Sequence, residues 1–98
     1  MFRTVVSVQL VDRRSRRAVM QRTVDLPFAP APMMELGFID PGTDAWSGCV
    51  EQCIWSFAEN CFHVELEDWA SGRYVLEDMI ADLGPEWRRI DVPKEPAA

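Results

Sequence analysis

The sequence predicts an α+β domain in which an antiparallel β-sheet of about five strands is packed on one face by a single C-terminal α-helix. Apolar and polar residues alternate along residues 2–12, 17–26 and 33–40, as in strands with one buried face. Residues 49–69 have the pattern of a β-hairpin, and from residue 76 the apolar spacing changes to a helical period. Because consecutive hairpins form a meander, the expected sheet is antiparallel, either open or coiled into a half-barrel.

The hairpin at residues 49–69 is the best-patterned stretch of the chain. A two-residue turn at 59–60 gives three apolar cross-strand pairs, namely Phe57 with Phe62, Trp55 with Val64 and Cys53 with Leu66. All six side chains share one face, because strand side chains alternate with period two. A shift of one residue would bring Trp55 opposite Glu65, so the pattern favours the first register.

The two strands before this hairpin are expected at residues 2–12 and 17–26, joined by a polar tip at residues 13–16. Alternation places four apolar residues of the first strand on one face: Phe2, Val6, Val8 and Leu10. In the return strand Arg22 interrupts the apolar row, which leaves open which of its two sides faces the core.

Proline residues end the second strand, because proline lacks the amide donor that a sheet ladder needs; they are Pro27, Pro30 and Pro32. This segment is expected to follow an edge or to cross the sheet, with Phe28 plugging one end of the core. A third strand is expected at residues 33–40, followed by a loop at residues 41–48 that carries Trp46.

The C-terminal helix is predicted from five apolar residues with helical spacing: Leu76, Met79, Ile80, Leu83 and Trp87. Asp68 or Ser71 is expected to cap its start, and Gly84-Pro85 marks its end. The predicted core contains the apolar faces of the strands and of this helix: Val6, Val8, Leu10, Val24, Leu26, Leu36, Phe38, Trp55, Phe57, Phe62, Val64, Leu66, Met79, Ile80 and Leu83.

Length and composition predict one domain at residues 1–92 with a flexible tail at residues 93–98. The apolar content is 48%, as in ordinary globular proteins, and no apolar run reaches the ~20 residues of a membrane span. The first ten residues alternate like a strand rather than a signal peptide. Three cysteines, an odd number, argue against a disulfide framework. We therefore expect a bacterial-type cytoplasmic protein that does not bind membranes.

Charge is distributed unevenly along the chain. Residues 1–34 contain six basic and two acidic residues, a net charge of +4, whereas residues 35–98 contain four basic and 14 acidic residues, a net charge of −10. This asymmetry indicates self-complementarity or an acidic partner. The candidate partner-binding residues are the arginines of the predicted tip and the loop tryptophan, since arginine matches phosphate and carboxylate groups and tryptophan is enriched at binding hot spots: Arg13, Arg14, Arg16, Arg17 and Trp46.

The sequence predicts no catalytic residues, no metal site and no cofactor. Cys61 and His63 share one side of a strand, with Glu65 and Glu67 beyond them, but zinc sites need further ligands at spacings that the chain lacks. Residues i and i+2 of a strand also lie roughly 6–7 Å apart, too far for a direct Cys–His hydrogen bond.

The predicted function is therefore that of a small non-enzymatic interaction domain, such as an adaptor, an inhibitor or immunity-type protein, or an assembly subunit. Its partner is another protein or a second copy, because the second sheet face carries apolar residues that one helix cannot cover: Val5, Val11, Val19, Ile39 and Ile54. The alternative is a nucleotide- or nucleic-acid-binding module that uses the arginine-rich tip.

Overall fold

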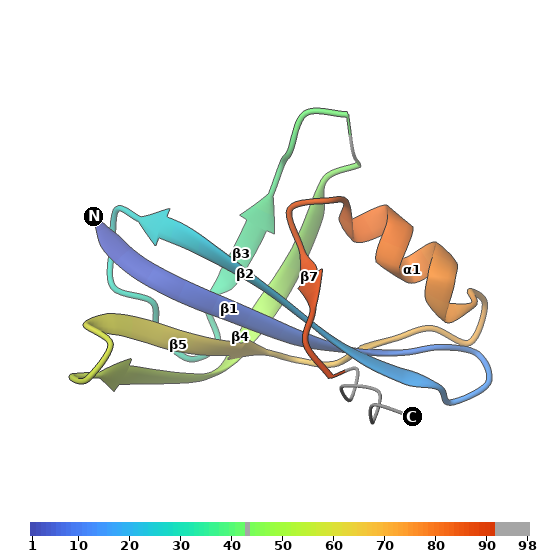
Figure 1. Cartoon of the computed structure of the whole chain (residues 1–98), viewed down its shortest axis with the longest axis horizontal. Helices are drawn as coiled ribbons and strands as arrows, with labels where there is room; N and C mark the ends of the chain where they lie inside the picture. Colours follow the sequence, from blue (N-terminus) through green and yellow to red (C-terminus); the bar gives the residue numbers. More distant parts are fainter. Residues whose placement is uncertain (43, 92–98) are drawn as a thin grey trace, which may run out of the picture.

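The chain folds into a curled β-sheet with one short helix, as shown by a computed structural model that describes residues 1–42 and 44–91 (Figure 1). Its elements are β1 (Phe2–Val11), β2 (Arg17–Leu26), β3 (Glu35–Phe38), β4 (Trp46–Ser56), β5 (Cys61–Leu66), β6 (Trp69–Ala70), α1 (Leu76–Leu83) and β7 (Arg88–Arg89). The predicted tail at residues 93–98 lies outside the described residues. No helix in the described part of the chain is long and apolar enough to span a membrane.

The sheet is mixed, so the prediction of a purely antiparallel meander of about five strands is wrong. The strand order is β3-β4-β5-β1-β2-β7, and β6 also pairs with β1. β1 is antiparallel to β2 but parallel to β5 and β6. The reason is the proline segment after β2, which carries the chain to the opposite edge of the sheet. β3 therefore starts a new ladder there, and the β4–β5 hairpin returns beside β1.

The β4–β5 hairpin has the predicted faces but a register that differs by two residues. Trp55 pairs with Phe62 and Cys53 with Val64, while Phe57 belongs to the turn and is 91% exposed. Side-chain alternation has period two, so a two-residue shift preserves both faces and the pattern alone does not exclude it. Asn60 has the positive φ, 55°, that this tight turn requires.

A β-bulge between Val50 and Gln52 changes which residues of β4 face the core. Beyond the bulge Val50 pairs with Leu66 and is 1% exposed, whereas Glu51 is exposed. An uninterrupted ladder would place Glu51 on the apolar face, so the extra residue keeps a carboxylate out of the core.

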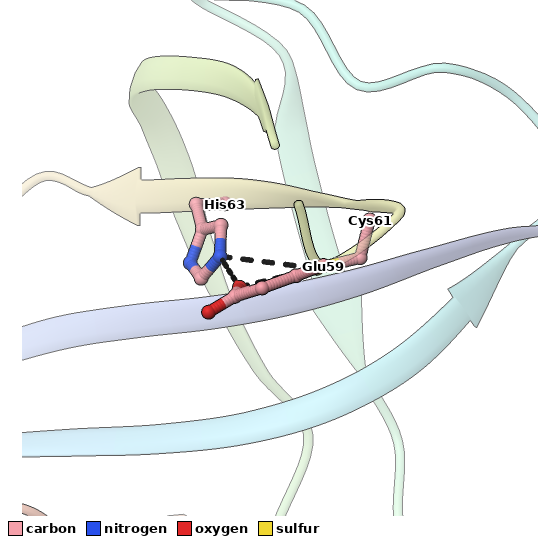
Figure 2. A group of neighbouring side chains, drawn as sticks. All are labelled: Glu59, Cys61 and His63. Atoms are coloured by element: carbon pink, nitrogen blue, oxygen red, sulfur yellow. Dashed lines mark hydrogen bonds and ion pairs between the residues drawn. The ribbon is translucent and has the colours of Figure 1, made fainter. Parts of the chain in front are cut away.

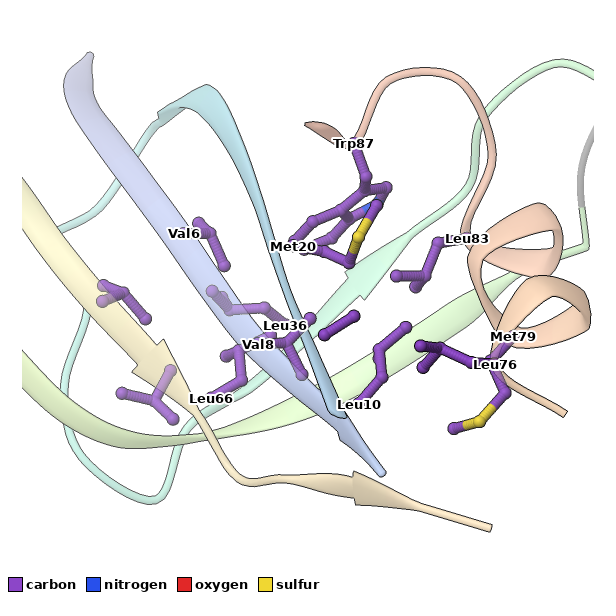
Figure 3. Packing of buried hydrophobic residues seen from close by; sticks show 13 residues of the cluster. Val6, Val8, Leu10, Met20, Leu36, Leu66, Leu76, Met79, Leu83 and Trp87 are labelled. Atoms are coloured by element: carbon purple, nitrogen blue, oxygen red, sulfur yellow. The ribbon is translucent and has the colours of Figure 1, made fainter. Parts of the chain in front are cut away.

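The core lies between the inner face of the curled sheet and α1 (Figure 3). Eight predicted core residues are buried: Val6, Val8, Leu10, Leu36, Val64, Leu66, Met79 and Leu83. Six are half-buried: Val24, Leu26, Phe38, Trp55, Phe62 and Ile80. The prediction that Phe57 belongs to the core is wrong, because the shifted register places Phe57 in the exposed turn. Six further buried apolar residues were outside the predicted set: Ala18, Met20, Val50, Cys61, Leu76 and Trp87.

The start of α1 is held by a residue from the other end of the chain. Val75 at the N-cap position makes no side-chain cap, and the Asp12 carboxylate instead accepts the backbone N–H of Leu76 at 3.1 Å. The predicted cap Ser71 accepts the N–H groups of Arg73 and Tyr74, one turn earlier. Asp12 thus supplies the acceptor that a local N-cap residue would normally provide.

Arg22 faces the inner side of the sheet, where it pairs across strands with buried Val6. Its side chain is 13% exposed, and two of its nitrogens contact the Asp40 carboxylate at 2.8 and 3.3 Å. The guanidinium also lies 5.1 Å from the ring centroid of Phe38 and 5.6 Å from that of Trp87. Arg22, which interrupts the apolar row of β2, therefore faces the core with an ionic partner and two aromatic contacts.

Candidate functional site

The arginine-rich tip between β1 and β2 is organised around the buried carboxylate of Asp12. This carboxylate accepts the backbone N–H groups of Arg14 at 2.9 Å and Arg16 at 2.8 Å, and the Arg16 Nε at 2.9 Å. Burial by itself raises the pKa of Asp12, but the hydrogen bonds outweigh it and the pKa lies below its ordinary value. Ser15 has φ 61°, the left-handed conformation that closes the turn.

The four candidate arginines of the tip do not act as one group. The Arg16 guanidinium donates to both oxygens of Glu77 at 3.1 and 3.0 Å, besides its contact with Asp12. The hydrogen bond with Glu77, followed by that with Asp12, raises the pKa of Arg16. Arg13, Arg14 and Arg17 are exposed, and their side chains have no ion pair within the described ranges. The tip therefore presents three arginines to a ligand rather than four.

Trp46 lies at the first residue of β4 and not in a loop. Its ring centroid is 5.9 Å from those of Phe38 and Trp69 and 5.7 Å from that of Trp87. The residue is half-buried, because the three neighbouring rings cover much of its surface. A partner-binding role for Trp46 remains a prediction, and its main contacts in the chain are with this aromatic cluster.

Glu59, Cys61 and His63 come together on the outer side of the β4–β5 hairpin (Figure 2). Cys61 Sγ lies 3.7 Å from Glu59 Oε2 and 3.8 Å from His63 Nε2, and the glutamate and histidine contact each other directly. The contact between Cys61 and His63 contradicts the prediction from strand geometry that these two residues lie too far apart to interact directly.

The cluster has a residue that sequence reasoning missed. Glu59 belongs to the hairpin turn, and the positive φ of Asn60 turns it back over β5. Burial, together with the Glu59 charge, raises the pKa of the Cys61 thiol, while the hydrogen bond from His63 lowers the pKa of Glu59. The sequence contains the spacing Glu59-x-Cys61-x-His63. This spacing indicates a cluster of the three side chains only when the turn is known to lie at residues 57–60.

The turn of the β4–β5 hairpin lies at the end of the sheet away from α1 (Figure 1). This end carries a second aromatic cluster. Phe62 lies between Phe2 and Trp55, with ring centroids 5.7 and 4.8 Å away, and Trp55 contacts Phe57 at 6.3 Å. Phe2 is 40% and Phe57 is 91% exposed. These four rings continue the inner, apolar face of the sheet away from α1, and we call them the aromatic end.

The predicted role of Phe28 as a plug for the core is wrong. Phe28 is 43% exposed, and the buried residue of the proline segment is Pro30. The Cys53 thiol donates to the Pro30 carbonyl at 3.4 Å, so the segment crosses the inner face beside β4. Phe28 therefore adds an exposed ring to the surface of the molecule.

β4 has an open edge next to the aromatic end. β3 pairs only with Trp46–Cys49 of β4, and the backbone of Met33 and Met34 extends these hydrogen bonds to Val50. In the part of the chain that the structure describes, no strand pairs with residues 52–56 on the side away from β5. The sequence of this segment, Gln-Cys-Ile-Trp-Ser, contains no charge and no proline.

The second sheet face is less exposed than predicted. Val5, Val11 and Val19 are half-buried, while Ile54 is 53% exposed on β4. Ile39 is 83% exposed but follows the end of β3, outside the sheet. The exposed apolar surface of this face is thus concentrated at Ile54, on the open edge.

Comparison of the chain with protein-family models, curated proteins and solved structures gave no significant match.

Proposed function

We propose that this chain is a non-enzymatic interaction domain that forms a symmetric homodimer by pairing the open edge of β4 with the same edge of a second copy. The observation that carries the proposal is the uncharged run at residues 52–56, which pairs with β5 on one side and with no strand of the described residues on the other. Natural sheets protect exposed edges with charges, prolines or covering segments, because an unpaired edge is a template for another strand. Residues 52–56 contain no charge and no proline, and the contact that the proline segment makes with them is through the Cys53 side chain rather than through a strand ladder. This pattern favours an edge used for pairing.

A second copy of the edge is the natural occupant because the segment is complementary to itself. Two antiparallel copies related by a two-fold axis at Ile54 place Ile54 opposite its counterpart, Cys53 opposite Trp55 and Gln52 opposite Ser56. No charge is buried in this register. Each copy also gains hydrogen-bonding partners for the backbone groups of a strand that is otherwise paired on one side.

The aromatic end adds apolar contact area on the inner side of the same edge. Trp55 faces this side, beside Phe62 and the exposed Phe57. In the proposed dimer the two aromatic ends approach each other across the joined sheet. Tryptophan and phenylalanine contribute strongly to interfaces, because large rigid side chains bury much surface with little loss of conformational entropy.

The first test is a charge placed at the centre of the edge. In Ile54→Lys, two ammonium groups would lie opposite each other across the two-fold axis, so we expect the dimer affinity to fall by at least about 100-fold. Ile54 is 53% exposed in the single chain, so the fold tolerates the lysine. Sedimentation equilibrium measures the change, with circular dichroism as the check on folding.

The matched control is Ile39→Lys, which adds the same charge at an isoleucine that is 83% exposed and outside the edge. This variant should dimerise like the parent protein. A parent protein that sediments as a monomer at the highest attainable concentration overturns the proposal, and so does an Ile54→Lys variant that dimerises normally.

A disulfide trap tests the register. With the three native cysteines Cys49, Cys53 and Cys61 replaced by alanine, Ile54→Cys should cross-link two copies under mild oxidation. Opposed residues of antiparallel strands have Cα atoms about 4.5–5.5 Å apart, within the range that a disulfide spans. Ile39→Cys in the same background should stay uncross-linked. A dimer that persists without forming the Ile54→Cys cross-link contradicts pairing through this edge.

Within this proposal we place the protein in the cytoplasm, which is supported by its three free cysteines, and assign it a role as an adaptor, an inhibitor or an assembly subunit. The nucleotide- or nucleic-acid-binding alternative ranks second, because Arg16 of the tip already contacts Asp12 and Glu77. Its test is the binding of oligonucleotides at low salt, which should fall steeply as the salt concentration rises.

A further inference from the structure

We propose that Glu59, Cys61 and His63 bind one divalent transition-metal ion, and that Zn²⁺ is the ion that suits them best. The three side chains offer a carboxylate oxygen, a thiol sulfur and an imidazole nitrogen, all within 4.8 Å of one another. This inference is independent of the homodimer, since every ligand comes from one chain.

The spacing of the ligand atoms matches a single tetrahedral ion. Zinc bonds of about 2.0–2.3 Å place neighbouring ligand atoms roughly 3.3–3.6 Å apart. Cys61 Sγ lies 3.7 Å from Glu59 Oε2 and 3.8 Å from His63 Nε2. Only the glutamate has to move away from His63 to admit the ion, and its side chain is 59% exposed.

The scaffold around the cluster holds two of the three ligands in place. Cys61 and His63 lie on β5, which pairs with β4 on one side and β1 on the other. The backbone of Glu59 is held in the turn, where its N–H donates to Ser56 Oγ at 3.2 Å. Figure 2 shows the three side chains converging over β5. Such a chelate requires little rearrangement on binding.

The donor set selects the kind of ion. A thiolate with an imidazole favours zinc and related transition metals over Mg²⁺ and Ca²⁺, which prefer oxygen ligands. Cys61 is buried but His63 and Glu59 are 40% and 59% exposed on their side chains, so water completes the coordination as the fourth ligand. Arg3 lines the same hollow, and its positive charge weakens binding relative to a site without it.

Cobalt(II) provides a direct test, because a thiolate bound to Co²⁺ gives a charge-transfer absorption in the near ultraviolet. Titration of the full chain with Co²⁺ should produce this band with a stoichiometry of one ion per chain. Adding Zn²⁺ should then remove the band by displacement. The affinity for Zn²⁺ follows from competition with a chromophoric chelator.

Matched cysteine variants separate this site from adventitious binding. Cys61→Ser should abolish the band and weaken Zn²⁺ binding by at least about 10-fold, whereas Cys49→Ser and Cys53→Ser should change neither. His63→Gln should also weaken Zn²⁺ binding by at least about 10-fold, and circular dichroism shows whether each variant is folded. A parent protein without the band, or a Cys61→Ser variant that keeps it, overturns the proposal.

Discussion

Replacing Asp12 by alanine is expected to lower the melting temperature by on the order of 10 °C. The side chain of Asp12 is fully buried, and its carboxylate accepts hydrogen bonds from the backbone of Arg14, Arg16 and Leu76 and from the Arg16 guanidinium. Alanine leaves these donors without their acceptor. It also removes the contact between the β1–β2 turn and Leu76, the first residue of α1, and leaves the Arg16–Glu77 pair as a side-chain link between the two elements.

The control for this substitution is Asp25→Ala, which removes an exposed carboxylate from the end of β2. Its melting temperature should stay within a few degrees of the parent value, since surface substitutions have small effects. Differential scanning calorimetry of both variants provides the comparison. Equal melting temperatures for Asp12→Ala and Asp25→Ala would contradict the central role of Asp12.

The same residue makes stability depend on pH in a defined direction. The pKa of Asp12 is lower in the folded protein than in the unfolded chain, so ionised Asp12 stabilises the fold above about pH 4. This contribution disappears as the pH falls through the lower, folded-state pKa. Asp12→Asn, which has no charge to lose, should show a shallower loss of stability on acidification than the parent protein in urea unfolding. If the free energy of unfolding depended on acidic pH identically in Asp12→Asn and the parent protein, this role of the Asp12 charge would be contradicted.

The sequence predicted the elements of the fold better than their neighbours in the sheet. β2 was predicted residue for residue, because alternation marks a strand wherever one face is buried. Alternation does not state which strands are adjacent, so the parallel pairing of β1 with β5 was missed. The hairpin register failed by two residues for a related reason, since period-two patterns fix a register only to within an even shift.

The candidate sites were limited by contacts between residues far apart in the chain. The arginine tip was visible as a charged run, but its link to Glu77 spans 61 residues and leaves no local pattern. The sequence pattern predicts a loop position for Trp46, because the apolar alternation of the hairpin begins at residue 49, three residues after β4 starts. The position of Glu59 in the Glu59–Cys61–His63 cluster depends on the geometry of the hairpin turn. A hairpin register that is wrong by two residues also places this turn incorrectly. In each case the residue types were visible and their spatial partners were not.

Arg22→Ala is expected to cost about 3 kcal/mol in the free energy of unfolding. The substitution removes the ion pair with Asp40 and the contacts of the guanidinium with Phe38 and Trp87. Both charged side chains are largely buried, 13% and 18% exposed, so the remaining carboxylate loses an opposing charge where water screens it poorly. Urea unfolding measures the loss, with Arg17→Ala on the exposed part of β2 as a control that should stay within about 0.5 kcal/mol.

Variants that keep the shape of Arg22 separate its charge from its packing. Within the described ranges the Arg22 Nε has no hydrogen-bond acceptor, so a methionine of similar length gives up little hydrogen bonding at that atom. Arg22→Met should therefore be less destabilising than Arg22→Ala, and adding Asp40→Asn should restore part of the loss by removing the remaining charge. If Arg22→Met/Asp40→Asn were less stable than Arg22→Met alone, the ion pair would not be the reason that this arginine faces the core.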